Sequence, residues 1–525
     1  MESTIYSLIP PIVALVMVLF TRRVLLSLGI GSLTAAILLA DFHPGETVSI
    51  IWESVKGLFI SDGAINSWNV NIILFLLLLG CITAFVSISG GSRAFGEWAL
   101  KHVKTRTGAQ LTAACLGIII FIDDYFNSLA VGQIARPLTD RNGVSRAKLA
   151  YIIDSTAAPI CVISPISSWG AYIIALLVPI LSANALQISG FSAFVQMIPM
   201  NFYVLAALLF VFVSSWKNIN FGKMKVHEDR ALVEGIVASP DKQAPGELSS
   251  NLPISEKGSI YDLIIPIIVL IIATVSAMLW TGSQATEGKV TILKMFENTD
   301  VALSLVIGGS VGFIVTVILF LRQVYSKKAV NRSLFVSGLI EGVRSMIPAI
   351  LILLFAWVIC DLIGDLETGS YLAGVVHQLN ISIGFLPFIF FVLAGVMALS
   401  TGTSWGSFGI LMPIAGDIVA TMDSNMLLPS LAAVLAGAVF GDHCSPISDT
   451  TILSSTGAGC NHMDHVLTQL PYALTAAIIA AIGFLVLGLT GSTLLSFILV
   501  IILCVIILYG LNKYSARNNN VKHDI

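Results

Sequence analysis

The sequence GDHCSPISDTT, residues 441–451, places two carboxyl groups, an imidazole and a proline between strongly apolar flanks. Proline removes one backbone N–H and leaves a carbonyl one turn earlier without its helical partner, so a helix that contains this run is expected to break. The motif SPIS occurs a second time at residues 164–167. The sequence therefore predicts two interrupted helices, over about 148–182 and about 427–460.

The composition indicates that these breaks lie inside a membrane. Of 525 residues, 56% are hydrophobic and only 11% are Asp, Glu, Lys or Arg, whereas about a quarter of a soluble domain is charged. The net charge of −3 is spread thinly along the chain and excludes nucleic acid as an expected partner. Apolar runs near the roughly 20 residues that cross a bilayer predict further spans. These lie at about 5–21, 23–40, 68–90, 193–215, 260–281, 301–321, 338–360, 466–488 and 490–511.

Two other apolar stretches are predicted to enter the membrane and return on the same side. Residues 108–135 have basic residues at both ends, and basic residues stay on the cytoplasmic side. Because a stretch this short cannot cross twice, we expect a re-entrant hairpin with DDYFNS, residues 123–128, near its tip. Residues 384–420 are expected to form a second hairpin with STGTSWG, residues 400–406, at its turn.

The basic loops also give an orientation. If they are cytoplasmic, the N-terminus is outside, the C-terminus is cytoplasmic and the two hairpins enter from opposite sides. The predicted fold is an all-α polytopic membrane protein with two inverted repeats, each with a re-entrant hairpin and an interrupted transmembrane helix, a plan that recurs in secondary transporters. The expected divisions are an N-terminal repeat at 1–215, a cytoplasmic and mobile polar linker at 216–259, a C-terminal repeat at 260–488, and an extra transmembrane helix with a cytoplasmic tail at 489–525.

Polar groups near the hairpin tips and the breaks are the candidates for ion binding. A carboxyl group at membrane depth is costly unless it is paired, protonated or solvated by a cavity, and carbonyl and hydroxyl oxygens suit a hard cation such as Na⁺. The candidate cation- and proton-binding residues are Asp123, Asp124, Asn127, Asp154, Ser164, Ser167, Asp442, His443, Ser445, Ser448 and Asp449, with Asp123, Asp442 and Asp449 as expected Na⁺ ligands. The structural alternatives are aspartates that cap the first tip, proline kinks whose hydroxyls bond back to the helix, and a polar network that closes the second break.

The second hairpin turn offers a different kind of site. A helix is expected to begin there, and its amide end could attract an anionic group of a substrate. The candidate substrate pocket consists of Trp169, Thr401, Thr403, Ser404 and Trp405. By contrast, His462, Asp464 and His465 precede a span on the predicted cytoplasmic side, and we expect them to form a solvated helix cap. The seven cysteines are scattered and predict neither a disulfide framework nor a metal site.

Five motifs together resemble the NhaC-type sodium/proton antiporter family. They are DDYFN at 123–127, DSTAAP at 154–159, SPISSWG at 164–170, TSWG at 403–406 and GDHCSPISDT at 441–450, and the resemblance covers roughly residues 5–490. It implies the hairpin-and-broken-helix plan and the exchange of Na⁺ and H⁺ across a bacterial cytoplasmic membrane, with no cofactor beyond the transported ions. The family also includes exchangers of carboxylic acids such as malate and lactate, which these motifs do not separate.

The leading hypothesis is a secondary active transporter, a Na⁺/H⁺ antiporter that works by alternating access and binds the two cations competitively. The alternative is a Na⁺- or H⁺-coupled transporter of an organic anion, such as malate or lactate, or of an amino acid; the lack of an arginine at either tip disfavours it. An enzyme is not expected, because an intramembrane aspartyl protease needs a Gly-x-Gly-Asp motif and residue 439, two before Gly441, is valine. A passive channel and a homodimer stay open at this point.

Overall fold

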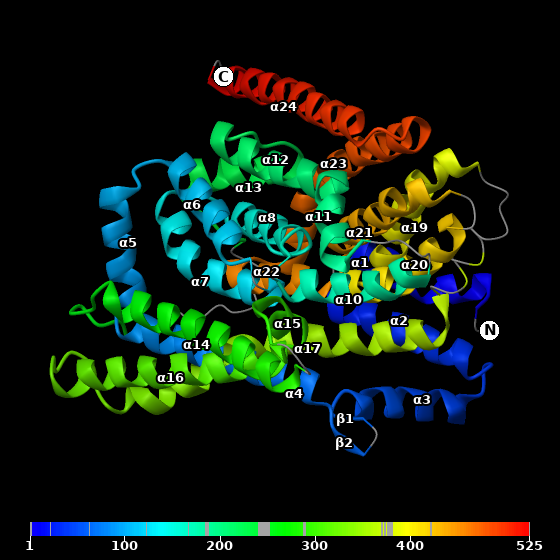
Figure 1. Ribbon diagram of the computed structural model, residues 1–525. Coiled ribbons are helices and arrows are strands. Elements are labelled where there is room, and N and C mark those ends of the chain that lie inside the picture. The colour runs from blue at the N-terminus through cyan, green and yellow to red at the C-terminus, as the bar shows by residue number, and fades with distance from the viewer. Residues whose placement is uncertain are drawn as a thin grey trace.

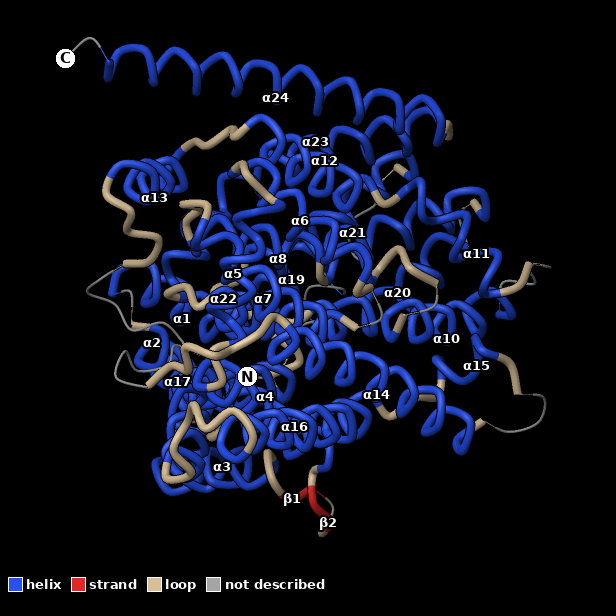
Figure 2. The backbone as a smooth tube through the Cα atoms, turned by 90° about the vertical axis from the view of Figure 1, so that its left-hand side faces the viewer, coloured by secondary structure: helices blue, strands red, loops and turns tan. Residues whose placement is uncertain are grey.

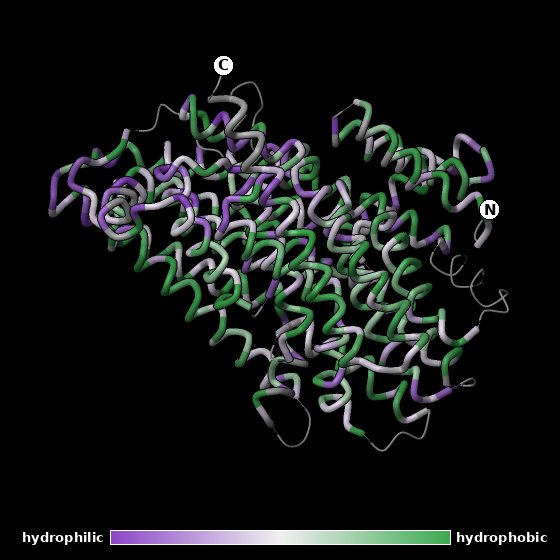
Figure 3. The backbone as a smooth tube through the Cα atoms, turned by 90° about the horizontal axis from the view of Figure 1, so that it is seen from above, coloured by the Kyte–Doolittle hydropathy of each residue, from purple (hydrophilic) through white to green (hydrophobic). Residues whose placement is uncertain are grey.

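The computed structural model describes residues 3–21, 23–61, 63–121, 123–165, 167–183, 188–239, 253–286, 290–368, 371, 374, 382–420 and 423–523. The regular elements of this part of the chain are helices, apart from one short hairpin of strands β1 (Ile60–Ser61) and β2 (Ala64–Ile65). Within it, nine helices are long and apolar enough to cross a membrane. Figure 3 shows the hydrophobic colour along the helix bodies and the hydrophilic colour gathered towards helix ends. The expected all-α polytopic membrane fold is confirmed.

One layer of helices lies in the lower half of Figures 1 and 2. Within it α4 packs against both α16 and α17, α14 packs on α16, and α2 packs on α17. The sequence gives these helices long apolar runs, so they expose large side chains such as Ile272 and Ile318 to lipid. The elements are η1 (Ile5–Leu8), α1 (Ile9–Thr21), α2 (Val24–Leu39), α3 (Pro44–Gly57), α4 (Ser67–Ile88), α14 (Tyr261–Ala285), α15 (Ile292–Glu297), α16 (Val301–Tyr325) and α17 (Leu334–Asp365).

A second layer lies above the first in both views and contains the two hairpins, the two interrupted helices and long apolar helices such as α23 and α24. Here α7 packs on α22, α8 packs on α22 and α6, and α19 packs on α21. Helix α5 (Gly91–His102) contacts α4, α7 and α14 and so joins the layers. The members are α6 (Arg106–Ile119), α7 (Asp124–Arg141), α8 (Arg146–Thr156), α9 (Ala158–Cys161), α10 (Ser168–Ala183), α11 (Gly190–Met197), η2 (Ile198–Met200), α12 (Phe202–Lys217), α13 (Gly222–Val233), η3 (Ile383–Phe385), α19 (Leu386–Thr401), α20 (Ser404–Ala420), η4 (Ser424–Met426), α21 (Leu427–Cys444), α22 (Asp449–Ala458), α23 (His462–Thr490) and α24 (Thr493–His523).

Both expected hairpins are present as helix pairs. The first turns between the end of α6 at Ile119 and the start of α7 at Asp124. The second turns between α19 and α20, where Gly402 ends α19 with φ +69°. A side chain at residue 402 would be strained by this φ and would collide with Ile447, so glycine is required there.

Both interrupted helices are also present where the SPIS motifs predict them. The first break separates α9, which ends at Cys161, from α10, which begins at Ser168. The second separates α21, which ends at Cys444, from α22, which begins at Asp449. The two halves of the chain are in direct contact, because α7 lies against α22.

Two expectations about the middle of the chain need correction. The span predicted at 193–215 is split into α11, η2 and α12, because Pro199 lacks an N–H and Asn201 caps α12 through Val204 N at 3.3 Å. The linker at 216–259 is not wholly mobile, since it contains α13. Glu228 of α13 is buried and accepts hydrogen bonds from Arg106 at 2.8 Å and from the backbone N–H of Ser145 at 2.7 Å. Residues 240–252 of this linker lie outside the described residues.

Asn127 holds the first hairpin tip to the first interrupted helix. Its side-chain Nδ2 lies 2.7 Å from the carbonyl oxygens of Gly117 and Ile120 and 3.1 Å from that of Thr156. These carbonyls lie at the ends of α6 and α8, where the helix supplies no further N–H. One buried amide therefore satisfies backbone groups that would otherwise be left unpaired at membrane depth.

We predict that Gly457→Ala lowers the stability of the protein, because a Cβ at residue 457 of α22 would collide with the carbonyl oxygen of Ser128 in α7. Overpacking of this kind costs about 1–3 kcal/mol. Thermal unfolding of the purified protein in detergent measures the effect. The matched control is Gly364→Ala in α17, where a Cβ meets no atom within 4 Å. An equal melting temperature for the two variants would contradict the close contact of α7 and α22.

Asn127→Ala is expected to destabilise the protein by at least about 2 kcal/mol, because each buried carbonyl left unpaired costs about 1–3 kcal/mol. The control is Asn142→Ala just after α7, whose Nδ2 donates one hydrogen bond within the described residues, to the carbonyl oxygen of Leu138 at 2.9 Å. Limited proteolysis and thermal unfolding of both variants test the difference. The tip is not held by Asn127 if the two substitutions have the same effect.

Candidate functional site

The two hairpin tips and the second break meet around one cavity between the layers. Its volume is about 280 Å³. From the upper layer it is lined by the first tip with the start of α7, by the second tip with the start of α20, and by the start of α22; from the lower layer it is lined by α4, α16 and α17. The lining residues are Trp68, Asn69, Asp123, Asp124, Tyr125, Val301, Trp357, Thr403, Trp405 and Asp449. We call this space the carboxyl cavity.

Three carboxyl groups line the carboxyl cavity. Asp123 and Asp124 are 4% and 2% exposed, and Asp449 is half-buried. Asp124 Oδ2 is buried and has no hydrogen-bond partner in the described structure. None of the described residues that line the cavity is Lys or Arg, so the protein itself supplies no fixed positive charge there. The described residues form no ready metal centre of three His, Cys, Asp or Glu side chains.

Tyr125 connects the two halves of the chain across this cavity. Its hydroxyl donates a hydrogen bond to Asp449 Oδ2, and the other oxygen of Asp449 accepts one from the backbone N–H of Thr450 at 2.8 Å. Asp124 and Asp449 are each in the first turn of a helix, α7 and α22, where the helix dipole stabilises negative charge. The sequence placed Tyr125 near the tip but gave no reason to assign it a role.

Asp442 belongs to the same region but does not line the cavity. Its Oδ2 accepts a hydrogen bond from Ser404 at 2.7 Å, and its Oδ1 has no partner among the described atoms. Ser404 is the first residue of α20, so Asp442 in α21 lies against the second hairpin tip. The carboxyl group of Asp449 is close enough to Asp442 for their negative charges to repel each other.

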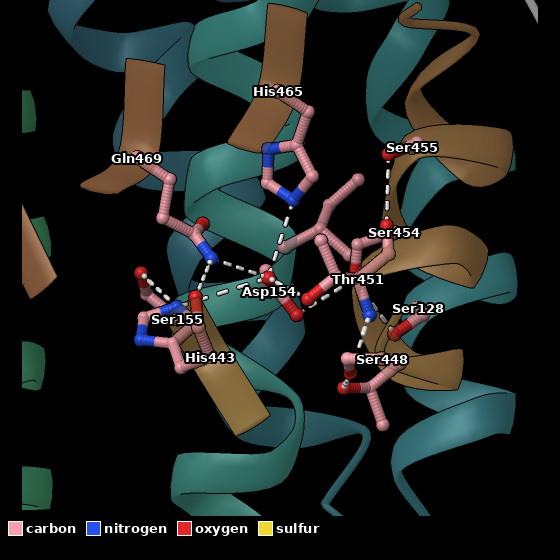
Figure 4. A network of polar contacts seen from close by, with 12 residues as sticks. Ser128, Asp154, Ser155, His443, Ser448, Thr451, Ser454, Ser455, His465 and Gln469 are labelled. Atoms are coloured by element: carbon pink, nitrogen blue, oxygen red, sulfur yellow. Dashed lines mark hydrogen bonds and ion pairs between the residues drawn. The ribbon is translucent and has the colours of Figure 1, made fainter. Parts of the chain in front are cut away.

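Asp154 forms a separate buried centre between α8, α22 and α23 (Figure 4). Gln469 Nε2 donates to Asp154 Oδ2 at 2.5 Å, and the Thr451 hydroxyl donates to the same oxygen at 3.2 Å. Ser454 donates to Oδ1 at 3.2 Å, and His465 Nε2 lies 3.2 Å from Oδ2. Both oxygens of Asp154 therefore accept hydrogen bonds, and Asp154 does not line the carboxyl cavity.

His443 lies beside the Asp154 centre, with Nε2 3.9 Å from Asp154 Oδ2. Its Nδ1 lies 2.6 Å from the Tyr203 hydroxyl, and its Nε2 lies 3.2 Å from that of Ser155. Tyr203 and Ser155 come from α12 and α8, so the imidazole joins three helices of the upper layer.

The expected solvated cap at the start of α23 is wrong. His462, Asp464 and His465 are 3%, 7% and 0% exposed. His465 faces Asp154, and His462 Nε2 lies 2.7 Å from the carbonyl oxygen of Pro446 in the second break. The sequence does not show that α23 packs against α8 and α22. These two helices bury the first turn of α23.

The four serines of the SPIS motifs lie at the breaks and not in the carboxyl cavity. Ser164 donates to the carbonyl oxygen of Ile160 at 2.7 Å, and Ser167 donates to that of Cys161 at 2.7 Å. Ser445 donates to the carbonyl oxygen of Leu399 at 2.9 Å. Ser448 caps α22 by accepting from the backbone N–H of Thr451 at 3.3 Å. These bonds are those of the structural alternative, in which the hydroxyls satisfy the backbone.

The residues expected to form a substrate pocket are divided between the cavity and its packing. Thr403 and Trp405 line the cavity. Trp169 is fully buried and packs edge-on against Trp405, with ring centres 5.5 Å apart. Thr401 bonds back to the carbonyl oxygen of Met397 at 3.0 Å. No local sequence signal marks Trp68, Asn69 and Trp357 as cavity residues, because each lies in an ordinary apolar span.

A second cavity, the arginine cavity, lies further along the same layer interface. Its volume is about 350 Å³, and its lining residues are Thr83, Ser87, Ser92, Arg93, Gln133, Arg136, Pro137, Asp140, Arg141, Arg146 and Ile254. Helices α4 and α7 line both cavities. Asn69 and Thr83 are separated by roughly 20 Å along α4. A small space of about 20 Å³ adjoins the arginine cavity, with which it shares Thr83, Ser92 and Gln133. The rest of its lining is apolar and includes Leu79, Ala130 and Leu263.

Comparison with known proteins agrees with a transporter. The model of the Na⁺/H⁺ antiporter family matches residues 160–489, which is more than half of the chain. An uncharacterized protein of Haemophilus influenzae is 47% identical over 516 residues, which cover 98% of this chain and 96% of that protein. The match to the family model includes Asp442 and Asp449 but begins after the first hairpin.

Two relatives with named activities match over shorter stretches. An uncharacterized Na(+)/H(+) antiporter of H. influenzae is 33% identical over 151 residues, 28% of this chain and 31% of that protein. The malate-2H(+)/Na(+)-lactate antiporter of Bacillus subtilis is 31% identical over 188 residues, 34% of this chain and 36% of that protein. This chain thus matches about a third of the length of each.

These matches are to a family of transporters and not to a class of enzymes, and they confirm the resemblance found in the motifs. Together with the nine apolar helices, they show that the chain is a multi-pass membrane protein of the Na⁺/H⁺ antiporter family, and thus a secondary transporter.

Proposed function

We propose that the protein exchanges Na⁺ for H⁺ across a bacterial cytoplasmic membrane and that the carboxyl cavity binds both ions. The observation that carries this proposal is the set of Asp123, Asp124 and Asp449 around one cavity without a lysine or arginine in its described lining. Carboxylates removed from bulk water need a counter-charge or a proton. Na⁺ can supply the first and H⁺ the second.

Competition for these carboxyl groups is enough to couple the two fluxes. When Asp124 and Asp449 are ionised, their negative charges attract Na⁺, and when they are protonated that attraction is lost. Asp124 and Asp449 line the cavity and are the most direct ligands, and Tyr125 holds Asp449 in place. Thr403 and Asn69 add oxygen atoms of the kind that Na⁺ accepts.

The layer interface supports alternating access. The carboxyl cavity and the arginine cavity lie at different depths along α4 and α7, with apolar side chains between them. A shift of the upper layer against the lower layer would close the carboxyl cavity and open a path from it to the arginine cavity. In this proposal the carboxyl cavity faces outwards and the arginine cavity faces the cytoplasm, with the N-terminus outside and the C-terminus inside.

The remaining candidate residues have supporting roles in this proposal. Asp442 positions the second tip through Ser404 and adds negative charge near Asp449. Asp154 and His443 hold the upper-layer helices together through their hydrogen bonds to Gln469, Thr451 and Tyr203. We also propose that residues 1–215 and 260–488 are inverted repeats, an arrangement that would bring the two tips to one cavity from opposite sides.

Asp449→Asn and Asp124→Asn are expected to reduce Na⁺-dependent proton exchange by more than about tenfold, because an amide can neither release a proton nor attract a cation, and loss of a bond to a charged group costs roughly 1.5–3 kcal/mol. Proteoliposomes with an imposed pH gradient and a pH-sensitive dye measure the exchange. The control is Asp423→Asn, in the turn before α21, where asparagine can keep the cap to Asn425 N.

The outcome that would count against this proposal is full Na⁺-dependent exchange by both cavity variants. An exchange in the native protein that ignores Na⁺ would also reject it. Loss of exchange in Asp423→Asn as well would show that the assay reports folding and not the cavity.

A second candidate function is the coupled transport of an organic anion or an amino acid. The observations that favour it are the arginine cavity, with Arg93, Arg136, Arg141 and Arg146 in its lining, and the named activity of the B. subtilis relative. Arg146 is already engaged, since its NH2 lies 3.3 Å from Asp140 Oδ2, so the site is less free than its composition indicates.

Counterflow distinguishes the two functions. Vesicles loaded with malate, lactate or an amino acid are expected to give no stimulation of Na⁺ uptake if the protein exchanges only Na⁺ and H⁺. Stimulation by malate or lactate that disappears in Arg141→Gln would favour the organic anion. Arg141 is suited to the test because it is exposed and its loss leaves the packed helices intact.

A further inference from the structure

The carboxyl cavity is larger than a single Na⁺ ion requires. A space of about 280 Å³ has room for on the order of ten water molecules. A dehydrated Na⁺ needs only a close shell of oxygen ligands, which would take up a small part of this volume. The size of the cavity is therefore a property that the exchange of Na⁺ and H⁺ leaves unexplained.

Aromatic rings make up much of the lining. Trp68 comes from α4, Trp357 from α17, Trp405 from α20 and Tyr125 from α7, so four separate helices each bring one aromatic side chain to the same space. Aromatic faces attract organic cations through their negative quadrupole, most strongly when the cation is removed from water.

These rings are not all explained as anchors at the membrane surface. Tryptophan is common at the membrane–water interface, and Trp68, which is 44% exposed, fits that explanation. Trp405 is half-buried and held in place, since it stacks on Tyr172 with ring centres 4.8 Å apart and packs on the buried Trp169. Trp357 is also half-buried in α17. Both are fixed parts of the cavity wall.

The charge of the cavity selects the sign of its ligand. Asp124 is 2% exposed and lines the cavity, so its carboxyl group is largely removed from bulk water and a nearby positive group would stabilise its ionised form. Asp123 and Asp449 add to the same potential. With no lysine or arginine in the described lining, an anion would be repelled and a neutral molecule would leave the carboxyl groups uncompensated.

We propose that the carboxyl cavity binds an organic ammonium compound, with Trp357 and Trp405 against its apolar part and Asp124 and Asp449 near its positive nitrogen. This inference rests on the proposed function, because it uses the same carboxyl groups, and it extends the transported cations from Na⁺ to a molecule that carries an ammonium group. The organic cation and Na⁺ then compete for one site.

The test measures binding to the full-length protein in detergent by the fluorescence of its tryptophans. The probe is choline, whose quaternary nitrogen cannot lose its charge, and the control is 3,3-dimethylbutan-1-ol, which has the same shape and no charge. We expect a saturable change with choline, none with the alcohol at equal concentration, and displacement of choline by Na⁺. Equal responses to both compounds, or no response to either, would overturn the inference.

Two variants assign the binding to the cavity. Trp357→Leu is expected to weaken choline binding by about tenfold, or about 1.4 kcal/mol, because leucine offers no aromatic face to a desolvated cation. Trp280→Leu is the matched control, because Trp280 is 55% exposed on α14 and does not line the cavity. A common melting temperature for both variants excludes misfolding as the cause, and equal choline affinity in both would overturn the inference.

The same preparations separate this inference from the proposed function. Na⁺/H⁺ exchange in proteoliposomes that choline does not inhibit would reject the organic ammonium ligand and leave the Na⁺/H⁺ antiporter intact. Saturable choline binding by a protein without Na⁺-dependent exchange would reject the Na⁺/H⁺ function and retain the ammonium site. Inhibition of exchange by choline, reduced in Trp357→Leu and unchanged in Trp280→Leu, would support both.

Discussion

The structure depends on how it accommodates carboxyl groups at membrane depth. An ionised carboxylate in a hydrocarbon environment is too costly to persist without water, a proton or a counter-charge. Asp154 meets this requirement with hydrogen bonds from Gln469, Thr451 and Ser454. Asp124 differs, because it lines the carboxyl cavity and its Oδ2 has no hydrogen-bond partner among the described residues. This contrast separates a carboxylate that stabilises the fold from one that is available to a cation.

The cavity in turn depends on helices that are interrupted but whose free backbone carbonyl groups still find hydrogen-bond donors. Each interrupted helix and each hairpin turn leaves carbonyl groups without an intrahelical donor. Side chains from neighbouring helices supply these donors. Asn127 bonds the carbonyls at the ends of α6 and α8, Gln469 bonds that of His443, and His462 lies against that of Pro446. Helix α23 is therefore part of the site although it contributes no side chain to the described lining of the cavity.

The sequence predicted the local elements better than their surroundings. The prolines of the two SPIS motifs and the basic ends of the first hairpin mark local events, and these were predicted at the correct residues. The packing of α23 against α8 and α22 joins residues far apart in the sequence. Local patterns therefore predict a solvated His465, although its side chain is fully buried. Trp357 carries no local signal at all, since one aromatic residue in an apolar helix looks like any other until α17 is placed beside α20 and α22.

The contact of Tyr125 with Asp449 explains why the two halves of the chain act as one site. The bond joins the first hairpin, which lies outside the family match, to α22, which lies within it. Asp124 at the start of α7 and Asp449 at the start of α22 belong to the same cavity lining. A positive ligand between the two carboxyl groups would remove the repulsion between them, whereas an empty cavity with both groups ionised would keep that repulsion. Because Trp68, Asn69, Val301 and Trp357 of the lower layer line the same space, a ligand held by these carboxyl groups would contact both layers at once.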